Sequence, residues 1–182
     1  MKYQDSWQQG NKVETGVREC VARYEIIKNF CSRLKQPFTV CDIGANMNYF
    51  GLRLTEDFQC TVMSFEFHQF EMRETLVKNN PNIFFVNKKL SLVNLKTLTK
   101  LIHFDVVLAL SVLHHLPGDS NEWVKEFSNL GNNTILELAL KDSAMVKTKT
   151  NYRKPKGKII GYGDSHLKNN FKRPIFLLTT PK

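Results

Sequence analysis

The feature that most constrains the fold of this chain is the stretch 38–51 (FTVCDIGANMNYFG), an apolar run that ends in an acid and a turn containing glycine. The run is typical of a buried strand, and the residues after the turn are typical of a helix start. A chain that turns through Gly44 into a helix points the unbonded N–H groups of the helix N-terminus at a ligand in the turn. We therefore expect a binding site for a nucleotide-like molecule at this turn.

A second apolar run, 60–66 (CTVMSFE), ends in Glu66, 24 positions after the acid of the first run. An acid about 20 residues beyond such a turn commonly binds the two hydroxyls of a ribose. A dinucleotide needs the pattern Gly-x-Gly-x-x-Gly, because its pyrophosphate approaches the backbone closely. Here Asn46 and Asn48 occupy the turn and the next glycine is Gly51. A nucleoside-bearing ligand without phosphates therefore fits better.

Strand-like and helix-like segments alternate through the first 140 residues. The predicted strands are 38–43, 60–66, 82–87, 104–110 and 133–139, and the predicted helices are 17–31, 49–57, 68–80, 92–102 and 120–130. This alternation predicts an α/β fold, a doubly wound and mostly parallel sheet with helices on both faces. Two later apolar runs, 159–160 and 175–178, predict a short C-terminal β element.

The length of 182 residues predicts one domain. We divide it into an N-terminal helical segment (1–36), a ligand-binding core (37–140) and a basic loop with closing strands (141–182). No apolar run approaches the roughly 20 residues that span a bilayer, and the polar N-terminus does not resemble a signal peptide. The four cysteines lack Cys-x-x-Cys or zinc-site spacing. This favours the reducing cytoplasm, with no metal and no disulfides.

The net charge of +9 belongs to one segment. Residues 1–140 carry 15 Lys and Arg against 15 Asp and Glu, whereas residues 141–182 carry 11 against 2. Such a surplus predicts an anionic partner. A phosphorylated acceptor and a nucleic-acid backbone both suit lysine and arginine side chains. A solvated tail without a partner is the remaining interpretation.

Three parts of the chain together resemble the motifs of class I S-adenosylmethionine-dependent methyltransferases: 40–50 (VCDIGANMNYF), Glu66 and 104–116 (FDVVLALSVLHHL). They stand in the family's order and spacing over about residues 35–140. The resemblance implies a Rossmann-like fold, a methyltransferase activity and S-adenosyl-L-methionine as the cofactor. It implies these cofactor-binding residues: Asp42 and Gly44 near the methionine end, Asn46 and Asn48 in the same turn, Glu66 at the ribose, Phe67, Asn87 and Lys88 near the adenine, and Leu110 and Ser111 at the sulfonium-side rim. Many members have glycine where this chain has Asn48.

Methyl transfer mainly requires the acceptor to be oriented and water to be excluded, and a general base helps when the acceptor is a hydroxyl. His115 and His114 follow the fourth strand, at the edge where open α/β sheets bind ligands. The segments 161–167 (GYGDSHL) and 173–176 (RPIF) resemble the end of methyltransferases that modify bacterial surface glycans or related phosphorylated acceptors. We therefore expect an O-directed enzyme with His115, His114 and His166 as candidate catalytic residues.

Two alternatives remain open. The basic segment equally suits an RNA or DNA methyltransferase, in which Tyr152 and Tyr162 stack on bases. The absence of an Asn/Asp-Pro-Pro-Tyr stretch disfavours the amino-group methyltransferases that act on adenine or glutamine. The other alternative is a catalytically inactive methyltransferase-like domain that binds nucleic acid or a partner protein through its basic C-terminal segment.

Overall fold

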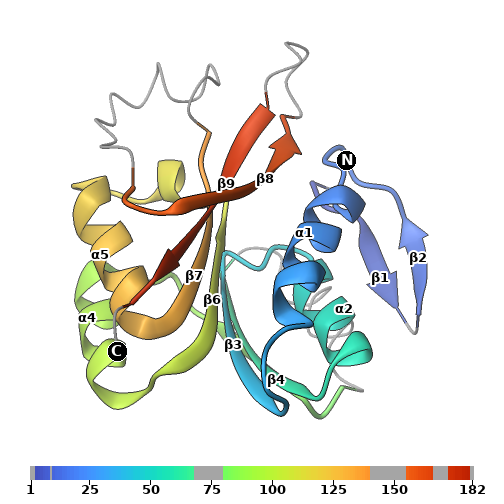
Figure 1. The fold of residues 1–182 in the computed structure, drawn as a ribbon, viewed down its shortest axis with the longest axis horizontal. Coiled ribbons are helices and arrows are strands. Elements are labelled where there is room, and N and C mark those ends of the chain that lie inside the picture. Colours follow the sequence, from blue (N-terminus) through green and yellow to red (C-terminus); the bar gives the residue numbers. More distant parts are fainter. Residues whose placement is uncertain (1–2, 9, 68–79, 140–154, 166–171, 181–182) are drawn as a thin grey trace. The chain divides into compact units, whose positions relative to one another are not determined.

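The computed structural model describes residues 3–8, 10–67, 80–139, 155–165 and 172–180 (Figure 1). The chain divides into two compact units, Met1–Lys89 and Leu90–Lys182. The predicted helix 68–80, apart from its last residue, and most of the basic segment 141–158 lie outside the described residues.

The first unit combines a small hairpin, two helices and three parallel strands. Its elements are β1 (Ser6–Gln8), β2 (Asn11–Glu14), α1 (Val21–Cys31), β3 (Phe38–Ile43), α2 (Tyr49–Asp57), β4 (Cys60–Glu66) and β5 (Ile83–Asn87). β4 lies between β3 and β5 and pairs in parallel with both. β3 is buried at every residue except Thr39. This burial explains its nearly continuous apolar sequence.

The start of the chain differs from the predicted helical segment. β1 and β2 form an antiparallel hairpin, and α1 begins at Val21 rather than at residue 17. All four residues of β2 are exposed. The alternation of apolar and polar residues that identifies a half-buried strand is therefore missing from the sequence. Gly10, with φ of 77°, lies in the hairpin turn, where glycine adopts a left-handed conformation without strain.

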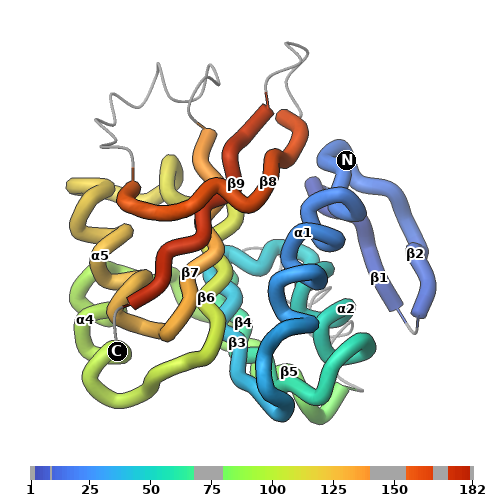
Figure 2. Tube along the Cα trace, viewed as in Figure 1, coloured from blue at the N-terminus to red at the C-terminus, as the bar shows by residue number. Residues whose placement is uncertain are grey.

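The second unit packs two helices against its strands. Its elements are α4 (Leu92–Leu101), β6 (Phe104–Leu110), the 3-10 helix η1 (Leu113–His115), α5 (Ser120–Leu130), β7 (Gly131–Glu137), β8 (Lys158–Asp164) and β9 (Lys172–Thr179). β6 and β7 are parallel, whereas β9 runs antiparallel to both β7 and β8 (Figure 2). α4 and α5 lie side by side, and α5 contacts β6 and β7.

A mostly parallel α/β architecture is thus confirmed. β3, β4 and β6 have the predicted bounds, and β7 begins and ends two residues before the predicted run 133–139. The predicted C-terminal β element is the β8–β9 pair. The Asp119 side chain accepts a hydrogen bond from the N–H of Asn121, so Asp119 is the N-cap of α5. The doubly wound arrangement with helices on both faces stays a prediction.

All four cysteines are free and buried. Burial raises the pKa of the Cys31 and Cys60 thiols to about 12. These thiols stay protonated near neutral pH and pack as small apolar groups. In the part of the chain that the structure describes, the helices are too short or too polar to cross a bilayer.

Candidate cofactor-binding site

The turn after β3 is held by hydrogen bonds from its own backbone. The N–H groups of Gly44 and Ala45 both donate to the carbonyl oxygen of Phe65, at 2.9 and 3.2 Å. The N–H of Asn48 donates to the carbonyl of Ala45 at 2.8 Å. The first two bonds connect the turn to the end of β4, and the third closes the turn itself.

The other two N–H groups of the turn donate to side chains. Asn46 donates to Oε2 of Glu66 at 3.0 Å, and Met47 donates to Oε1 of Gln4 at 3.2 Å. Every backbone N–H from residue 44 to residue 48 therefore has an acceptor within the first unit. The expectation for the N–H groups of the helix start itself, which begins at Tyr49, stays a prediction. The bonding of residues 44–48 makes these five groups unavailable to a ligand. It also explains why the turn suits a ligand without phosphates, because phosphate binding needs unbonded N–H groups.

Three residues of the turn adopt the left-handed conformation. Their φ angles are 73° at Gly44, 51° at Asn46 and 59° at Asn48. Asparagine enters this region more readily than other residues that carry a Cβ. Asn46 and Asn48 thus adopt backbone conformations that would otherwise require glycine.

The side chain of Asn48 is fully buried. Its Oδ1 accepts a hydrogen bond from Oγ of Ser64 at 2.7 Å. A Cβ added to Gly51 would lie 2.6 Å from the same Oδ1. Asn48 therefore fills the space that Gly51 leaves inside the first helical turn, while its Nδ2 is buried without a hydrogen-bond partner among the described residues.

This packing makes Asn48 and Gly51 an energetically coupled pair. We expect Gly51→Ala to destabilise the protein by about 1–2 kcal/mol through overpacking, despite alanine's higher helix propensity. In the Asn48→Gly background the same change should be neutral or stabilising, by up to about 1 kcal/mol. Urea unfolding of the four proteins measures the coupling. An equal cost of Gly51→Ala in both backgrounds would contradict the packing argument.

Asp42, one residue before the end of β3, has a buried side chain that is 2% exposed. Its Oδ2 has no hydrogen-bond partner among the described residues. Burial, and to a smaller extent the charge of Glu66, raises the pKa of Asp42 to about 7. A buried carboxylate oxygen without a partner is costly, so it favours a ligand group that carries positive charge or a polar hydrogen.

Glu66 ends β4 with a carboxylate oriented by two backbone groups. Oε2 accepts from the N–H of Asn46, and Oε1 accepts from the N–H of Phe67 at 2.8 Å. These two bonds, one from the turn after β3 and one from the residue that follows β4, fix the orientation of the carboxylate. A pair of neighbouring hydroxyls, as on ribose, matches this carboxylate.

The residues predicted near the adenine lie around Glu66. Asn87 is the partner of Glu66 in the β4–β5 register, and the N–H of Lys88 donates to the carbonyl of Glu66 at 3.1 Å. Phe67 is 42% exposed, and Nζ of Lys89 lies 5.3 Å from its ring centre. An exposed aromatic ring beside the ribose position can pack against a flat base. The structure thus brings four of the predicted residues together.

The second unit holds the remaining predicted residues, at the end of β6. Leu110 is buried, and Ser111 has φ of 55°. Oγ of Ser111 donates to Oε2 of Glu137 at 2.6 Å and accepts from Nη1 of Arg173 at 3.0 Å. Glu137 and Arg173 are also buried, in β7 and β9. Arg173, a residue of the basic C-terminal segment, therefore lies in an internal polar network.

The two neighbouring histidines differ in exposure. His114 is half-buried and His115 is exposed, and their ring centres in η1 are 4.0 Å apart. The exposed imidazole of His115 is accessible to a substrate. His166 lies outside the described residues.

Several solved structures share this fold. WbdD, described as a bifunctional kinase-methyltransferase, matches with a TM-score of 0.72 and 23% identity over 90% of this chain. The 1,6-didemethyltoxoflavin-N1-methyltransferase of Burkholderia thailandensis, with S-adenosylhomocysteine bound, matches with a TM-score of 0.61 and 12% identity over 89% of this chain and 79% of its own. The N-terminal domain of EvdMO1, also with S-adenosylhomocysteine (SAH) bound, gives 0.58 and 13% over 97% and 76%.

The chain has the fold of the class I S-adenosylmethionine-dependent methyltransferases. This chain spans 40% of the length of the WbdD chain that it matches. No protein-family model matches the sequence, and a search of curated proteins found no match. The predicted resemblance is thus confirmed at the level of the methyltransferase fold.

Two residues that support the turn of this methyltransferase fold were not predicted from the sequence. Aligning the two predicted strands in parallel would have identified Ser64, because it is the partner of Asp42 in the register of β3 and β4. Gln4 precedes Met47 by 43 residues and belongs to a segment without a periodic pattern. No local signal in the sequence connects Gln4 with the turn.

Proposed function

We propose that this chain is an S-adenosylmethionine-dependent methyltransferase. The observation that carries the proposal is the Glu66 carboxylate at the end of β4, which two backbone N–H groups orient beside the turn after β3. Among the residues that the structure describes, one buried oxygen of Asp42 has no partner, which suits the cationic methionine end of the cofactor. Phe67 offers an exposed ring to the adenine. The residues present thus fit this cofactor, which when bound supplies an electrophilic methyl group on a positively charged sulfur.

The protein's own contribution is to orient the acceptor and to remove its proton. Ser111, hydrogen-bonded to Glu137 and Arg173, gives the rim after β6 a fixed backbone. A fixed rim limits the orientations of the acceptor oxygen, which is where most of the rate enhancement in such a reaction arises. His115 is the candidate base for a hydroxyl acceptor. His114 and His166 are the other candidates.

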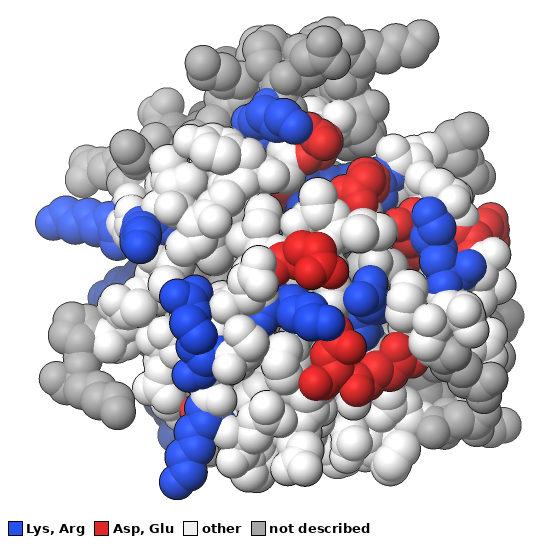
Figure 3. Space-filling model, turned by 45° about the vertical axis from the view of Figure 1, so that its right-hand side comes forward, with Lys and Arg blue, Asp and Glu red and all other residues white. Residues whose placement is uncertain are grey.

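The proposed acceptor is an oxygen of an anionic or phosphorylated small molecule or glycan. The basic surplus of residues 141–182 supports this, and a phosphorylated acceptor would connect the two activities named for WbdD. Of the described basic residues, Lys156 and Lys158 are exposed, whereas Lys172 pairs with Asp164. On the face drawn in Figure 3, acidic and basic side chains lie next to one another. The support for an anionic acceptor therefore comes mainly from the sequence.

Calorimetry with S-adenosylmethionine and SAH tests the proposal. We expect both to bind with measurable heat and to raise the unfolding temperature. ATP should not bind at the same concentrations, because the N–H groups of residues 44–48 already have acceptors. Absence of heat and of a thermal shift with SAH would contradict the proposal and favour the inactive methyltransferase-like domain.

The second candidate, an RNA or DNA methyltransferase, is favoured by the same basic surplus. Binding of a single-stranded RNA should then weaken steeply between 50 and 200 mM salt, by about 300-fold if six phosphates are contacted. Binding without salt dependence, or no binding, would leave small anionic and glycan acceptors as the proposal.

A further inference from the structure

Gln4 is a buried polar residue from the start of the chain that contacts the turn after β3. We infer that Gln4 is a positioning residue of the cofactor site, and that a closed N-terminal loop, the described residues between Tyr3 and Arg18, holds it in place. The expected effect of Gln4 on cofactor binding rests on the proposed function, whereas the hydrogen bond between Gln4 and Met47 is observed independently of it.

The bond between Gln4 and Met47 differs from the others in the turn. The remaining turn N–H groups donate to the turn itself or to the end of β4, whereas Met47 donates to a side chain from the N-terminus. Gln4 is 4% exposed and Met47 is 1% exposed. Without Gln4, the N–H of Met47 would be buried without an acceptor, and such groups are costly enough to make a turn rearrange. Any rearrangement there would displace the neighbouring Asn46 and its bond to Glu66.

The N-terminal loop is closed by contacts between its two ends. The N–H of Arg18 donates to the carbonyl of Tyr3 at 2.9 Å, and the N–H of Gly16 donates to Oδ1 of Asp5 at 2.8 Å. A Cβ added to Gly16 would lie 2.2 Å from the carbonyl carbon of Gln4. The returning chain therefore packs directly behind Gln4, and only glycine leaves room for it.

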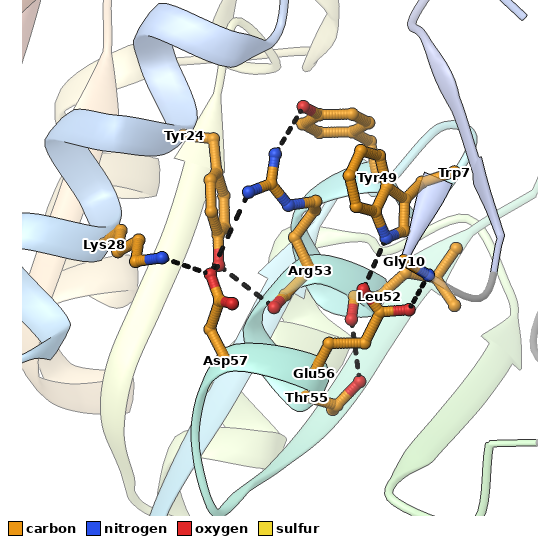
Figure 4. Close-up of polar contacts among 10 residues, drawn as sticks. All are labelled: Trp7, Gly10, Tyr24, Lys28, Tyr49, Leu52, Arg53, Thr55, Glu56 and Asp57. Atoms are coloured by element: carbon orange, nitrogen blue, oxygen red, sulfur yellow. Dashed lines mark hydrogen bonds and ion pairs between the residues drawn. The ribbon is translucent and has the colours of Figure 1, made fainter. Parts of the chain in front are cut away.

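Two residues of helix α2, Glu56 and Arg53, contact the outer part of the N-terminal loop, and we call these contacts the clamp (Figure 4). Nε1 of Trp7 and the N–H of Gly10 donate to the two carboxylate oxygens of Glu56, at 2.6 and 2.9 Å. The guanidinium of Arg53 lies 4.2 Å from the Trp7 ring centre and 4.0 Å from that of Tyr24, and both contacts are favourable cation–π interactions. An isolated hairpin is marginally stable in water, so this clamp keeps the loop folded.

The clamp and Gln4 contact neighbouring parts of the chain, helix α2 and the turn that precedes it. The clamp engages α2, which begins at Tyr49, and Gln4 engages Met47, two residues earlier. The loop thus contacts both the turn and the helix that follows it. Loosening the clamp should therefore free the turn without changing any residue in it.

Amide hydrogen exchange at Met47 tests the contact directly. In Gln4→Leu, which removes the acceptor, exchange at Met47 should rise at least about 10-fold and the Kd for SAH should rise about 10-fold, because a buried donor loses its acceptor. Gln4→Glu keeps an acceptor and should stay within about 3-fold of the wild type when both are measured at pH 5, where burial keeps the new carboxyl neutral. The matched control is Gln8→Leu, an exposed glutamine of the same loop, which should change neither quantity. Exchange at Val107 in the second unit reports global stability.

Trp7→Ala tests the role of the loop from a distance. It should also raise exchange at Met47 and the Kd for SAH, and Trp7→Phe, which keeps a ring over Arg53, should do so less.

Equal exchange at Met47 in Gln4→Leu and Gln8→Leu would overturn the inference. Faster exchange at Met47 in Gln4→Leu with an unchanged Kd for SAH would show that Gln4 has only a structural role, and would also overturn the inference. A wild-type chain that does not bind SAH overturns the proposed function instead, and the exchange rates then decide whether Gln4 holds the turn.

Discussion

Replacing Glu66 by alanine should weaken the binding of SAH by about 100-fold, the loss of two hydrogen bonds to a charged group at about 1.5 kcal/mol each. The reason is geometric. The N–H groups of Asn46 and Phe67 orient the carboxylate before any ligand arrives, so little ordering is needed on binding. Titration calorimetry of both proteins measures the change.

Two further variants separate this role from a general loss of charge. Glu66→Gln keeps the length of the side chain but has one acceptor oxygen, so its loss should be intermediate. Glu25→Ala removes an exposed acid of α1 and should leave the Kd unchanged. An unchanged Kd in Glu66→Ala would remove the ribose assignment.

Replacing Asp42 by asparagine should change how stability depends on pH. Burial, with a further contribution from Glu66, raises the pKa of Asp42 from 3.8 to about 7. An acid whose pKa is raised by folding binds its proton more tightly in the folded state. Its favourable contribution is therefore complete below pH 4 and is lost as the pH rises to about 7.

The expected size of this effect is large for one side chain. A rise of the pKa from 3.8 to about 7 corresponds to a loss of at most about 4 kcal/mol of unfolding free energy between pH 4 and pH 8. Asp42→Asn cannot ionise, so it should lack this loss and be more stable than the wild type at pH 8. Urea unfolding at several pH values measures both curves.

The matched control is Glu25→Gln, which changes an exposed carboxylate and should leave the pH dependence of stability as in the wild type. Glu66→Gln should reduce the loss in part, because it removes one of the two causes of the raised pKa. Parallel curves for the wild type and Asp42→Asn would show that the Asp42 carboxyl ionises normally.

The sequence by itself determined strands β3 to β7 and most of the described helices of this protein. β3, β4 and β6 could be predicted to the residue because a strand buried on both faces requires a continuous apolar run. The positions of Asp42 and Glu66 followed, since parallel strands that begin at one edge of a sheet end at the other. The β1–β2 hairpin could not be predicted because its exposed strand has no apolar pattern.

Only the tertiary structure decided how the candidate site is held. The N–H groups of residues 44–48 bond to the Phe65 and Ala45 carbonyls, to Glu66 and to Gln4, so none of these five groups is left to bind a phosphate. Asn48 replaces a glycine by filling the space beside Gly51. Hydrogen bonds and close packing depend on distances between atoms far apart in the sequence. A pattern read along the chain does not contain those distances.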